Sequence, residues 1–132
     1  MVTIPAKVVD LMNRPESVKI LVTANAAGQP HAIVCGSFFM LDESTIAVGE
    51  VLMKVSAKNM AENKKVSILV TSGKDAFEVS ATVGKRMTDG PVLTGLNDKM
   101  KAMHLHANAV WTFDATAVFD ESAGPNAGKK IA

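Results

Sequence analysis

The sequence has one cysteine, one tryptophan, no tyrosine and almost no net charge. The single cysteine, Cys35, excludes an internal disulfide and a zinc site made of several cysteines, and it agrees with a reducing compartment. Fourteen basic residues face thirteen acidic ones, so the chain has no broad basic surface for a nucleic-acid backbone. No apolar run approaches the length that spans a bilayer. We therefore expect neither nucleic acid nor a membrane as a partner.

Targeting signals and nucleotide-binding motifs are absent as well. Residues 1–16 lack the charged start, apolar core and cleavage site of a secretory signal, and no Asn-X-Ser/Thr acceptor occurs, so we expect a cytoplasmic location. No Gly-x-Gly-x-x-Gly follows an expected strand, which argues against the usual dinucleotide-binding fold. The stretches "TSGKD" and "GPNAGKKIA" depart from the P-loop pattern and do not indicate a nucleotide hydrolase.

The length and the hydrophobic content indicate one domain. With 132 residues, 48% of them hydrophobic, the chain can build one core but not two independent ones. We assign residues 1–132 to a single domain. We expect a helix capped by Thr3 within residues 1–14 and an irregular tail over residues 121–132.

Alternation of apolar and polar residues predicts a succession of short strands. The expected strands span residues 17–23, about 31–41, 45–50, 65–71, 77–87 and 109–119. The first two form a hairpin around the turn "ANAAGQP". Alternation places these apolar sets each on one strand face: Val18, Ile20 and Val22; Val66, Ile68 and Val70; Phe77, Val79, Ala81 and Val83; and Trp111, Phe113, Ala115, Ala117 and Phe119.

Helical segments lie between some of these strands. One helix of about two turns is expected in "MKVSAKNMAENKK", with Ser56 as its N-cap. Another is expected in "PVLTGLNDKMKAMHLH", where Leu96, Met100 and Met103 have helical spacing. Because the helices do not alternate regularly with the strands, the pattern favours a mainly β fold, and a small closed antiparallel barrel is the simplest solution.

The stretch from Gly49 to Asn63 carries the strongest chemical signal. It leaves a strand and enters a helix, so free backbone amides and the side chains of Lys54, Ser56 and Lys58 can converge on one anion, such as a phosphate. The alternative is that Ser56 only caps the helix and the lysines are only solvated. A carboxylate in this stretch, Glu50, would oppose a phosphate if it pointed inward.

Other reactive residues give weaker signals. Cys35 lies within an expected strand and is interpreted as a small buried residue rather than a nucleophile. The adjoining Gly36 indicates either close approach of a ligand or a bulge. His104 and His106 would face the same way on a strand, but only His31 remains as a third imidazole, so we expect no metal site. The two histidines are interpreted as part of a polar junction between a helix and a strand. No pair of carboxylates suits acid and base roles, and the catalytic residues stay unknown.

The order of these segments resembles that of a known family. "VKILVTANAAGQPHAIVCGSFFMLDESTIAVG", "KVSAKNMAENKKVSILV" and "FEVSATVGKRMTDGP" follow one another as in the pyridoxamine 5'-phosphate oxidase-like flavin-binding split barrels. The resemblance covers roughly residues 8 to 120 and includes a "GPNAGKKI" ending similar to that of small prokaryotic members. It implies a split β-barrel of six or so antiparallel strands and a homodimer with flavin mononucleotide (FMN) at the subunit interface.

The resemblance also implies where the cofactor would lie. Contacts to the isoalloxazine ring are implied for Val34, Cys35, Gly36, Ser37, Gly49, Glu50 and Val51. Contacts to the phosphate are implied for Lys54, Val55, Ser56 and Asn59, with Trp111 contributing near the interface. From the residues alone, Trp111 is open to three interpretations: core, dimer contact and cofactor stacking. Since flavin itself carries redox chemistry, the hairpin need not supply a catalytic side chain.

Departures from the family limit the functional prediction. Val55 stands where relatives often have threonine, and the chain lacks the arginine-rich C-terminal motif of true pyridoxamine 5'-phosphate oxidases, so we do not expect that activity. The expected function is an FMN-dependent oxidoreductase or electron-transfer protein of unknown substrate. The alternative is a small-ligand module for haem or for a deazaflavin, with His31, His104 and His106 as the only imidazoles for haem iron. Dimerisation is further expected from the apolar stripe at Trp111, Phe113 and Ala115.

Overall fold

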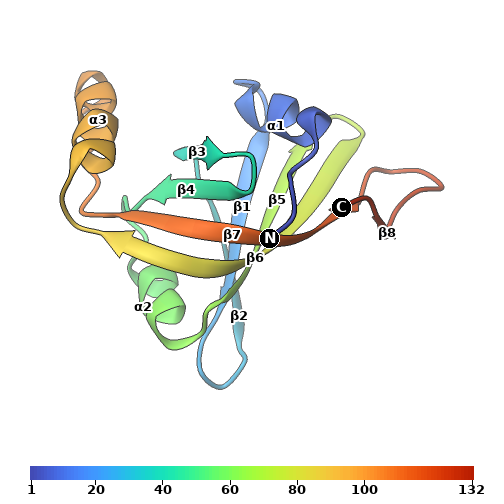
Figure 1. Ribbon diagram of the computed structural model, residues 1–132, viewed down its shortest axis with the longest axis horizontal. Coiled ribbons are helices and arrows are strands. Elements are labelled where there is room, and N and C mark those ends of the chain that lie inside the picture. Colours follow the sequence, from blue (N-terminus) through green and yellow to red (C-terminus); the bar gives the residue numbers. More distant parts are fainter.

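The computed structural model describes residues 1–132 and is dominated by antiparallel strands (Figure 1). The elements are α1 (Ala6–Asn13), β1 (Val18–Ala24), β2 (Pro30–Val34), β3 (Phe38–Asp42), β4 (Thr45–Gly49), α2 (Lys54–Glu62), β5 (Lys65–Ser72), β6 (Asp75–Met87), α3 (Pro91–Met100), the 3-10 helix η1 (Lys101–Met103), β7 (Val110–Asp120) and β8 (Lys129–Lys130). None of the helices combines the length and the apolar character needed to cross a membrane.

All strands belong to one curled sheet that stays open. The strand order is β2-β1-β5-β6-β7-β4-β3, with β8 paired to the far end of β7. Every pairing is antiparallel, which confirms the expected mainly β architecture. The expectation of a closed barrel is wrong, because the two edge strands, β2 and β3, do not pair with each other.

The open seam explains why the expected strand over residues 31–41 is two strands. β2 pairs with β1, whereas β3 pairs with β4 at the opposite edge of the sheet. Only residues 35–37 join them, and such a link reaches at most about 14 Å from Val34 to Phe38. The two edges therefore approach each other at this link and then diverge, which makes the barrel a split one.

The core lies inside the curled sheet. Val66, Ile68 and Val70 on β5 and Phe77, Val79, Ala81 and Val83 on β6 are all buried, as their alternation predicts. On β1 the set Val18, Ile20 and Val22 shares the outer face, while Leu21 and Thr23 point into the core. Alternation predicts the grouping of these side chains but not which face is buried.

A bulge changes the register of β7. Ala81 pairs with Ala115 and Ser80 with Ala117, so Thr116 is an extra residue in the strand. Trp111, Phe113 and Ala115 point into the core, but after the bulge Val118 is the buried residue. The expected single face from Trp111 to Phe119 is therefore wrong beyond Ala115, because a bulge shifts the alternation by one residue.

The first helix covers one end of the sheet. α1 buries Val8, Leu11 and Met12 and ends before Pro15, as expected. Thr3 does not cap it, because residues 2–4 run extended beside the sheet: the N–H of Ile4 bonds to the carbonyl of Glu43 at 2.8 Å. The helix starts after Pro5, whose fixed φ suits a helix start.

The third helix covers the outer face of the sheet at its other edge. Leu93 and Met100 on α3 pack with Ala47 of β4, Ala107 and Val110 in a second small core. Every residue of β4 is buried as a result, since its other face lies in the main core. The C-terminal tail is mostly turns, but its end is not irregular: β8 pairs with β7, and the N–H of Ile131 bonds to the carbonyl of Val118 at 2.8 Å.

Candidate functional site

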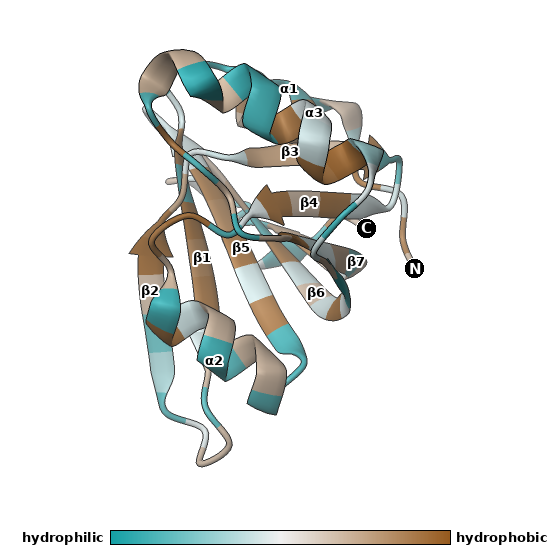
Figure 2. Ribbon diagram, turned by 90° about the vertical axis from the view of Figure 1, so that its left-hand side faces the viewer, coloured by the Kyte–Doolittle hydropathy of each residue, from teal (hydrophilic) through white to brown (hydrophobic).

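The second helix, α2, begins without a cap. It packs beside β1 and β2, at the opposite end of the sheet from α1 (Figure 2). Its first helical hydrogen bond runs from the N–H of Ala57 to the carbonyl of Met53 at 2.9 Å, and no side chain caps it. The N–H groups of residues 54–56 therefore lack helical acceptors and give this end of α2 a partial positive charge.

Ser56 is not the N-cap that the sequence suggests. The helix starts two residues earlier, at Lys54, so Ser56 lies in its first turn and is fully buried. Its Oγ has no hydrogen-bond partner, the only buried side-chain nitrogen or oxygen atom in the chain of which this is true. A buried hydroxyl without a partner costs about 1–3 kcal/mol. An external acceptor or donor at this position would recover that free energy.

A groove of about 260 Å³ opens at this helix start. We call it the helix-start groove, and its lining residues are His31, Ile33, Leu52, Met53, Lys54, Val55 and Ser56. Lys54 and Lys58 form no ion pair, so the charge at this end of α2 is not neutralised by the protein. The arrangement suits an anion that accepts hydrogen bonds from backbone N–H groups and from a lysine.

Asn59 has a structural task. Its Nδ2 donates to Thr23 Oγ1 at 3.1 Å, and both residues are buried, so the contact fastens α2 to β1. Asn59 and Lys58 also line a second hollow, between α2 and the β1–β2 turn, which shares Lys54 and Val55 with the helix-start groove. The structure thus brings Lys54, Val55 and Ser56 to one groove and Asn59 to the hollow beside it.

A larger, mostly hydrophobic groove adjoins the helix-start groove. This apolar groove has a volume of about 870 Å³ and runs between the β2–β3 link, β3, the residues after β4, and the α3–η1 segment. It gathers the predicted residues Val34, Cys35, Gly36, Ser37 and Val51. Leu52 lines both grooves, and Ile33 and Val34 are neighbours in β2 on either side of the boundary. The two grooves are therefore adjacent parts of one surface.

Exposed hydrophobic side chains concentrate on this surface. Of the eight large hydrophobic residues that are exposed, five line the apolar groove: Val34, Leu41, Leu52, Met103 and Leu105. Leu52 is 93% exposed and has a φ of 53°, a left-handed conformation that a leucine rarely adopts. Strained residues and clustered apolar surface both mark sites where something binds.

Four predicted contacts line neither groove: Gly49, Asn59, Glu50 and Trp111. The last two bond to each other. Glu50 is buried; its Oε1 accepts from Trp111 Nε1 at 2.8 Å and from Arg86 Nε at 3.0 Å, and its Oε2 accepts from Arg86 Nη2 at 2.9 Å. Trp111 is 4% exposed, so its ring belongs to the core and offers no free face. Of the three interpretations of Trp111, the structure supports the core position. The Trp111 stripe is not exposed, so it cannot be the dimer surface that the sequence suggested.

The Glu50 carboxylate helps to fix the segment that joins β4 to α2. The hydrogen bonds from Arg86 hold the pKa of Glu50 below its usual range, against the effect of burial. Its backbone is fixed too, with its N–H bonded to the carbonyl of Ala109 at 2.8 Å. Glu50 therefore does not oppose an anion at the helix start, because its charge is paired with Arg86. Sequence reasoning missed Arg86, which a bulge in β6 at residues 84–85 turns toward Glu50.

The remaining predicted residues have distinct environments. Cys35 is 7% exposed and burial raises the pKa of its thiol, so it is a small core residue and not a nucleophile. A Cβ at Gly49 would lie 2.6 Å from Leu96 Cδ2, so this glycine permits close packing of α3. A Cβ at Gly36 would meet nothing within 4 Å, so this position is open toward the apolar groove.

The histidines do not come together. His104 has a φ of 56° and ends η1, and His106 follows it in the loop before β7, so both lie at the junction between a helix and a strand, as expected. His31 lies on β2 in the helix-start groove. The wall that α3 and η1 add to the apolar groove is not predicted by the sequence. The spacing of Leu96, Met100 and Met103 predicts a helix, but it does not predict which surface that helix faces.

Comparison with known proteins agrees with this architecture. A family model described as pyridoxamine 5'-phosphate oxidase matches residues 4–122. HupZ of Group A Streptococcus superposes with a TM-score of 0.80 at 21% identity, covering 95% of this chain and 99% of its own. An FMN-binding protein from Syntrophomonas wolfei gives a TM-score of 0.75 at 14% identity, with 87% of this chain and 84% of its own covered.

A third similar structure is a putative pyridoxamine 5'-phosphate oxidase from Lactobacillus delbrueckii, with a TM-score of 0.72, 24% identity, and 89% of this chain and 93% of its own covered. The same fold also occurs in an F420 reductase and in HutZ, a haem storage protein from Vibrio cholerae. A comparison with curated proteins finds no match. Since the family model spans most of the sequence, the chain belongs to the pyridoxamine 5'-phosphate oxidase family.

Proposed function

We propose that this protein is an FMN-binding flavoprotein that takes part in electron or hydride transfer. The FMN phosphate lies at the start of α2, and the isoalloxazine ring lies along residues 34–37 in the apolar groove. The observation that carries the proposal is Ser56, a buried hydroxyl without a partner in the first turn of an uncapped helix, beside the unpaired Lys54. A phosphate supplies the acceptor that this hydroxyl lacks.

The helix-start groove fits a phosphate in charge as well. Three backbone N–H groups without helical acceptors, the α2 dipole and the Lys54 ammonium all favour a dianion. Val55 contributes only its backbone N–H, and Ser56 supplies a hydroxyl in place of the one missing at position 55. The nearest carboxylate along the chain, Glu50, is already paired with Arg86.

The apolar groove fits the ring and leaves space beside it. Its volume of about 870 Å³ lies near the upper end for small-molecule sites, and hydrophobic residues make up most of its lining. The open position at Gly36 allows a planar ring to approach the β2–β3 link closely. FMN supplies reversible electron and hydride transfer when it is bound, and the residues of this chain bind it, orient it and exclude water.

The substrate remains to be identified, but the chemistry of the chain is restricted. Lys99 is the one charged residue that lines the apolar groove, and no carboxylate or histidine lines it. The site therefore offers one ammonium group, and no carboxylate or imidazole, for proton transfer. Its activity depends on the cofactor and on positioning, which favours simple electron or hydride transfer.

We further propose a homodimer that covers the exposed hydrophobic side chains of this surface. Leu52, Val34 and Met103 are 93%, 74% and 60% exposed, and a monomer rarely leaves such a cluster in water. Because the Trp111 stripe is buried, the expectation of a dimer now rests on this exposed surface instead. Sedimentation at micromolar concentration should give a dimer. A strictly monomeric profile would reject the homodimer and with it a binding site shared between two subunits.

Spectroscopy and variants test the proposal together. Purified protein should show a flavin absorption spectrum, and chromatography after heat release should identify FMN. The double variant Lys54→Ala, Ser56→Ala should bind FMN at least about a hundredfold more weakly, since it loses two charge-assisted contacts. Lys65→Ala, which removes an exposed lysine at the start of β5, serves as the control and should leave the affinity unchanged. Equal affinity in the double variant would reject the site.

Haem is the second candidate ligand. The similar fold of a haem storage protein and the position of His31 in the helix-start groove favour it. A haem-bearing sample would show a Soret band that His31→Ala abolishes, in place of a flavin spectrum. A deazaflavin, suggested by the similar F420 reductase, would be identified by the same release and chromatography.

A further inference from the structure

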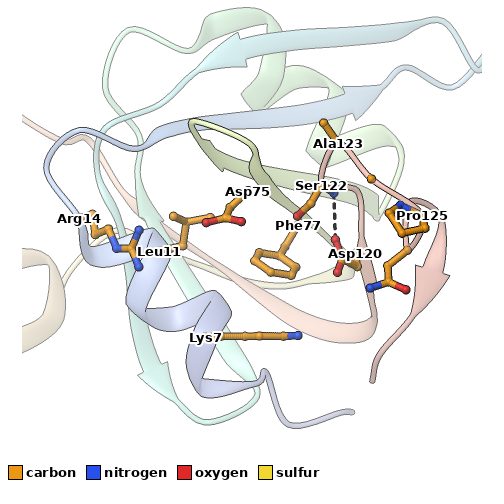
Figure 3. Close-up of a pocket in the computed structure, with 11 residues that line it drawn as sticks. Lys7, Leu11, Arg14, Asp75, Phe77, Asp120, Ser122, Ala123 and Pro125 are labelled. Carbon is orange, nitrogen blue, oxygen red and sulfur yellow. Dashed lines mark hydrogen bonds between the residues drawn. The ribbon is translucent and has the colours of Figure 1, made fainter.

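A third groove, of about 420 Å³, lies between α1, the start of β6 and the tail that follows β7 (Figure 3). In the ribbon, α1 lies at the opposite end of the sheet from α2 (Figure 1). None of the residues that line this third groove lines the helix-start groove or the apolar groove. We call it the charged groove, because its lining includes four charged side chains.

The two signs of charge come from different sides of the charged groove. Lys7 and Arg14 extend from α1, and Asp75 and Asp120 belong to the strands across from it (Figure 3). The two ion pairs of the chain, Arg86 with Glu50 and Lys101 with Asp98, involve none of these four residues. Cations and carboxylates thus share one hollow without an ion pair within 4.0 Å between them.

An aromatic ring lies between the two sides. Phe77 is 7% exposed, and Lys7 Nζ lies 5.4 Å from the centroid of its ring. Asp120 is held in place because its Oδ1 accepts the N–H of Ser122 at 2.9 Å. That hydrogen bond also lowers the pKa of Asp120. Ser122 Oγ in turn accepts the N–H of Ala76 at 3.0 Å.

We propose that the charged groove binds a small zwitterion, namely an α-amino acid with an apolar side chain. Its carboxylate faces Lys7 and Arg14, its ammonium faces Asp75 and Asp120, and its side chain meets the small part of Phe77 that is exposed to the groove. A ligand of one sign would meet one pair of charges favourably and be repelled by the other pair. A zwitterion matches both, and the volume suits a molecule of this size.

NMR titration of the full chain with amino acids and their blocked forms tests this assignment. Leucine, methionine and phenylalanine are the probes, and N-acetyl-leucine and leucinamide lack the ammonium and the carboxylate, respectively. At least one free amino acid should shift the amide signals of residues 120–126 saturably. Leucine should bind about tenfold more tightly than either blocked form, since each has lost one charge-assisted contact.

Variants locate the binding. Lys7→Gln should weaken binding about tenfold, and so should Asp120→Asn, which can keep the hydrogen bond from Ser122. Lys85→Gln, on the exposed part of β6 outside the groove, is the control and should bind as the wild type does. The proposal is overturned if none of the three amino acids binds, if the blocked forms bind equally well, or if folded variants at Lys7 and Asp120 keep full affinity.

Discussion

The helices α1 and α2 are alike in length, but α1 buries only apolar side chains whereas α2 also buries polar ones. α1 has 8 residues and α2 has 9, and they lie at opposite ends of the same sheet (Figure 1). The buried residues of α1 are Val8, Leu11 and Met12, while those of α2 are Ser56, Asn59 and Met60. Burial of apolar side chains stabilises a fold, whereas burial of polar ones is costly unless each finds a partner.

Two buried serines make the contrast specific. Ser17, just after α1, donates its hydroxyl to the carbonyl of Leu11. Ser56, in the first turn of α2, has no partner. The buried serine at the α1 end is therefore satisfied by the fold itself, whereas the one at the start of α2 is not. This difference is the reason to propose a ligand at α2.

The largest expected effect comes from the apolar side of α1. Met12→Ala removes a side chain that is 1% exposed, and we expect the free energy of unfolding to fall by about 2–5 kcal/mol. Denaturation in urea measures the loss. FMN affinity of the remaining folded protein should not change, because no residue of α1 lines the helix-start groove or the apolar groove. A loss of affinity at unchanged fold would mean that the two ends are coupled.

The next effect concerns the residue that leads into α2. Glu50→Gln should lower the free energy of unfolding by about 1–2 kcal/mol at pH 7, since it weakens a partly exposed ion pair with Arg86. Because folding lowers the pKa of Glu50, this stabilisation is present above the unfolded value of about 4.3 and is lost as the pH falls through the folded value. The wild type and the variant should therefore converge in acid. A constant difference between pH 7 and pH 3 would exclude this origin.

The two serines should respond in opposite directions. Ser17→Ala breaks a satisfied hydrogen bond and should cost about 1 kcal/mol, because the Leu11 carbonyl loses its partner. Ser56→Ala removes an unsatisfied hydroxyl and should raise the stability of the ligand-free protein by about 1 kcal/mol while weakening FMN binding. The melting temperature measured without FMN reports the change in stability, and its rise on addition of FMN reports the change in FMN binding. Destabilisation by both substitutions would show that Ser56 has a structural partner.

The smallest effect is expected at Leu52. Leu52→Gly relieves a left-handed backbone, which is offset by the greater freedom of glycine in the unfolded chain, so stability should change by less than about 1 kcal/mol. Removal of a 93% exposed leucine should nevertheless weaken dimerisation, measured by sedimentation. An unchanged dimer would place the interface elsewhere.

The sequence predicts the regular parts of this fold well. Strands β5 and β6 follow from strict alternation, because they run without a break through the core up to residue 83. Alternation does not predict the break at residues 35–37 or the extra residue Thr116 in β7, since both depend on how the sheet curves. Alternation also cannot tell that Val22 faces outward while Thr23 is buried.

The candidate site was predictable in its local part. Lys54, Val55 and Ser56 are close in sequence, so a helix start brings them together whatever the rest of the fold does. The wall from α3 and η1 depends on packing against β4, and the pairing of Glu50 with Arg86 depends on a bulge, so neither could be read from spacing. The same holds for Trp111, whose indole bonds to Glu50 across 61 positions of sequence.

The central claim, that the start of α2 holds a phosphate, is tested most directly by comparing FMN with riboflavin, which lacks the phosphate. Fluorescence titration should show that the wild type binds FMN at least about a hundredfold more tightly than riboflavin. The Lys54→Ala, Ser56→Ala variant should lose most of this preference and keep only the part that the backbone N–H groups of α2 contribute. Equal binding of both flavins by the wild type, or a preference for FMN that the variant keeps in full, would contradict the claim.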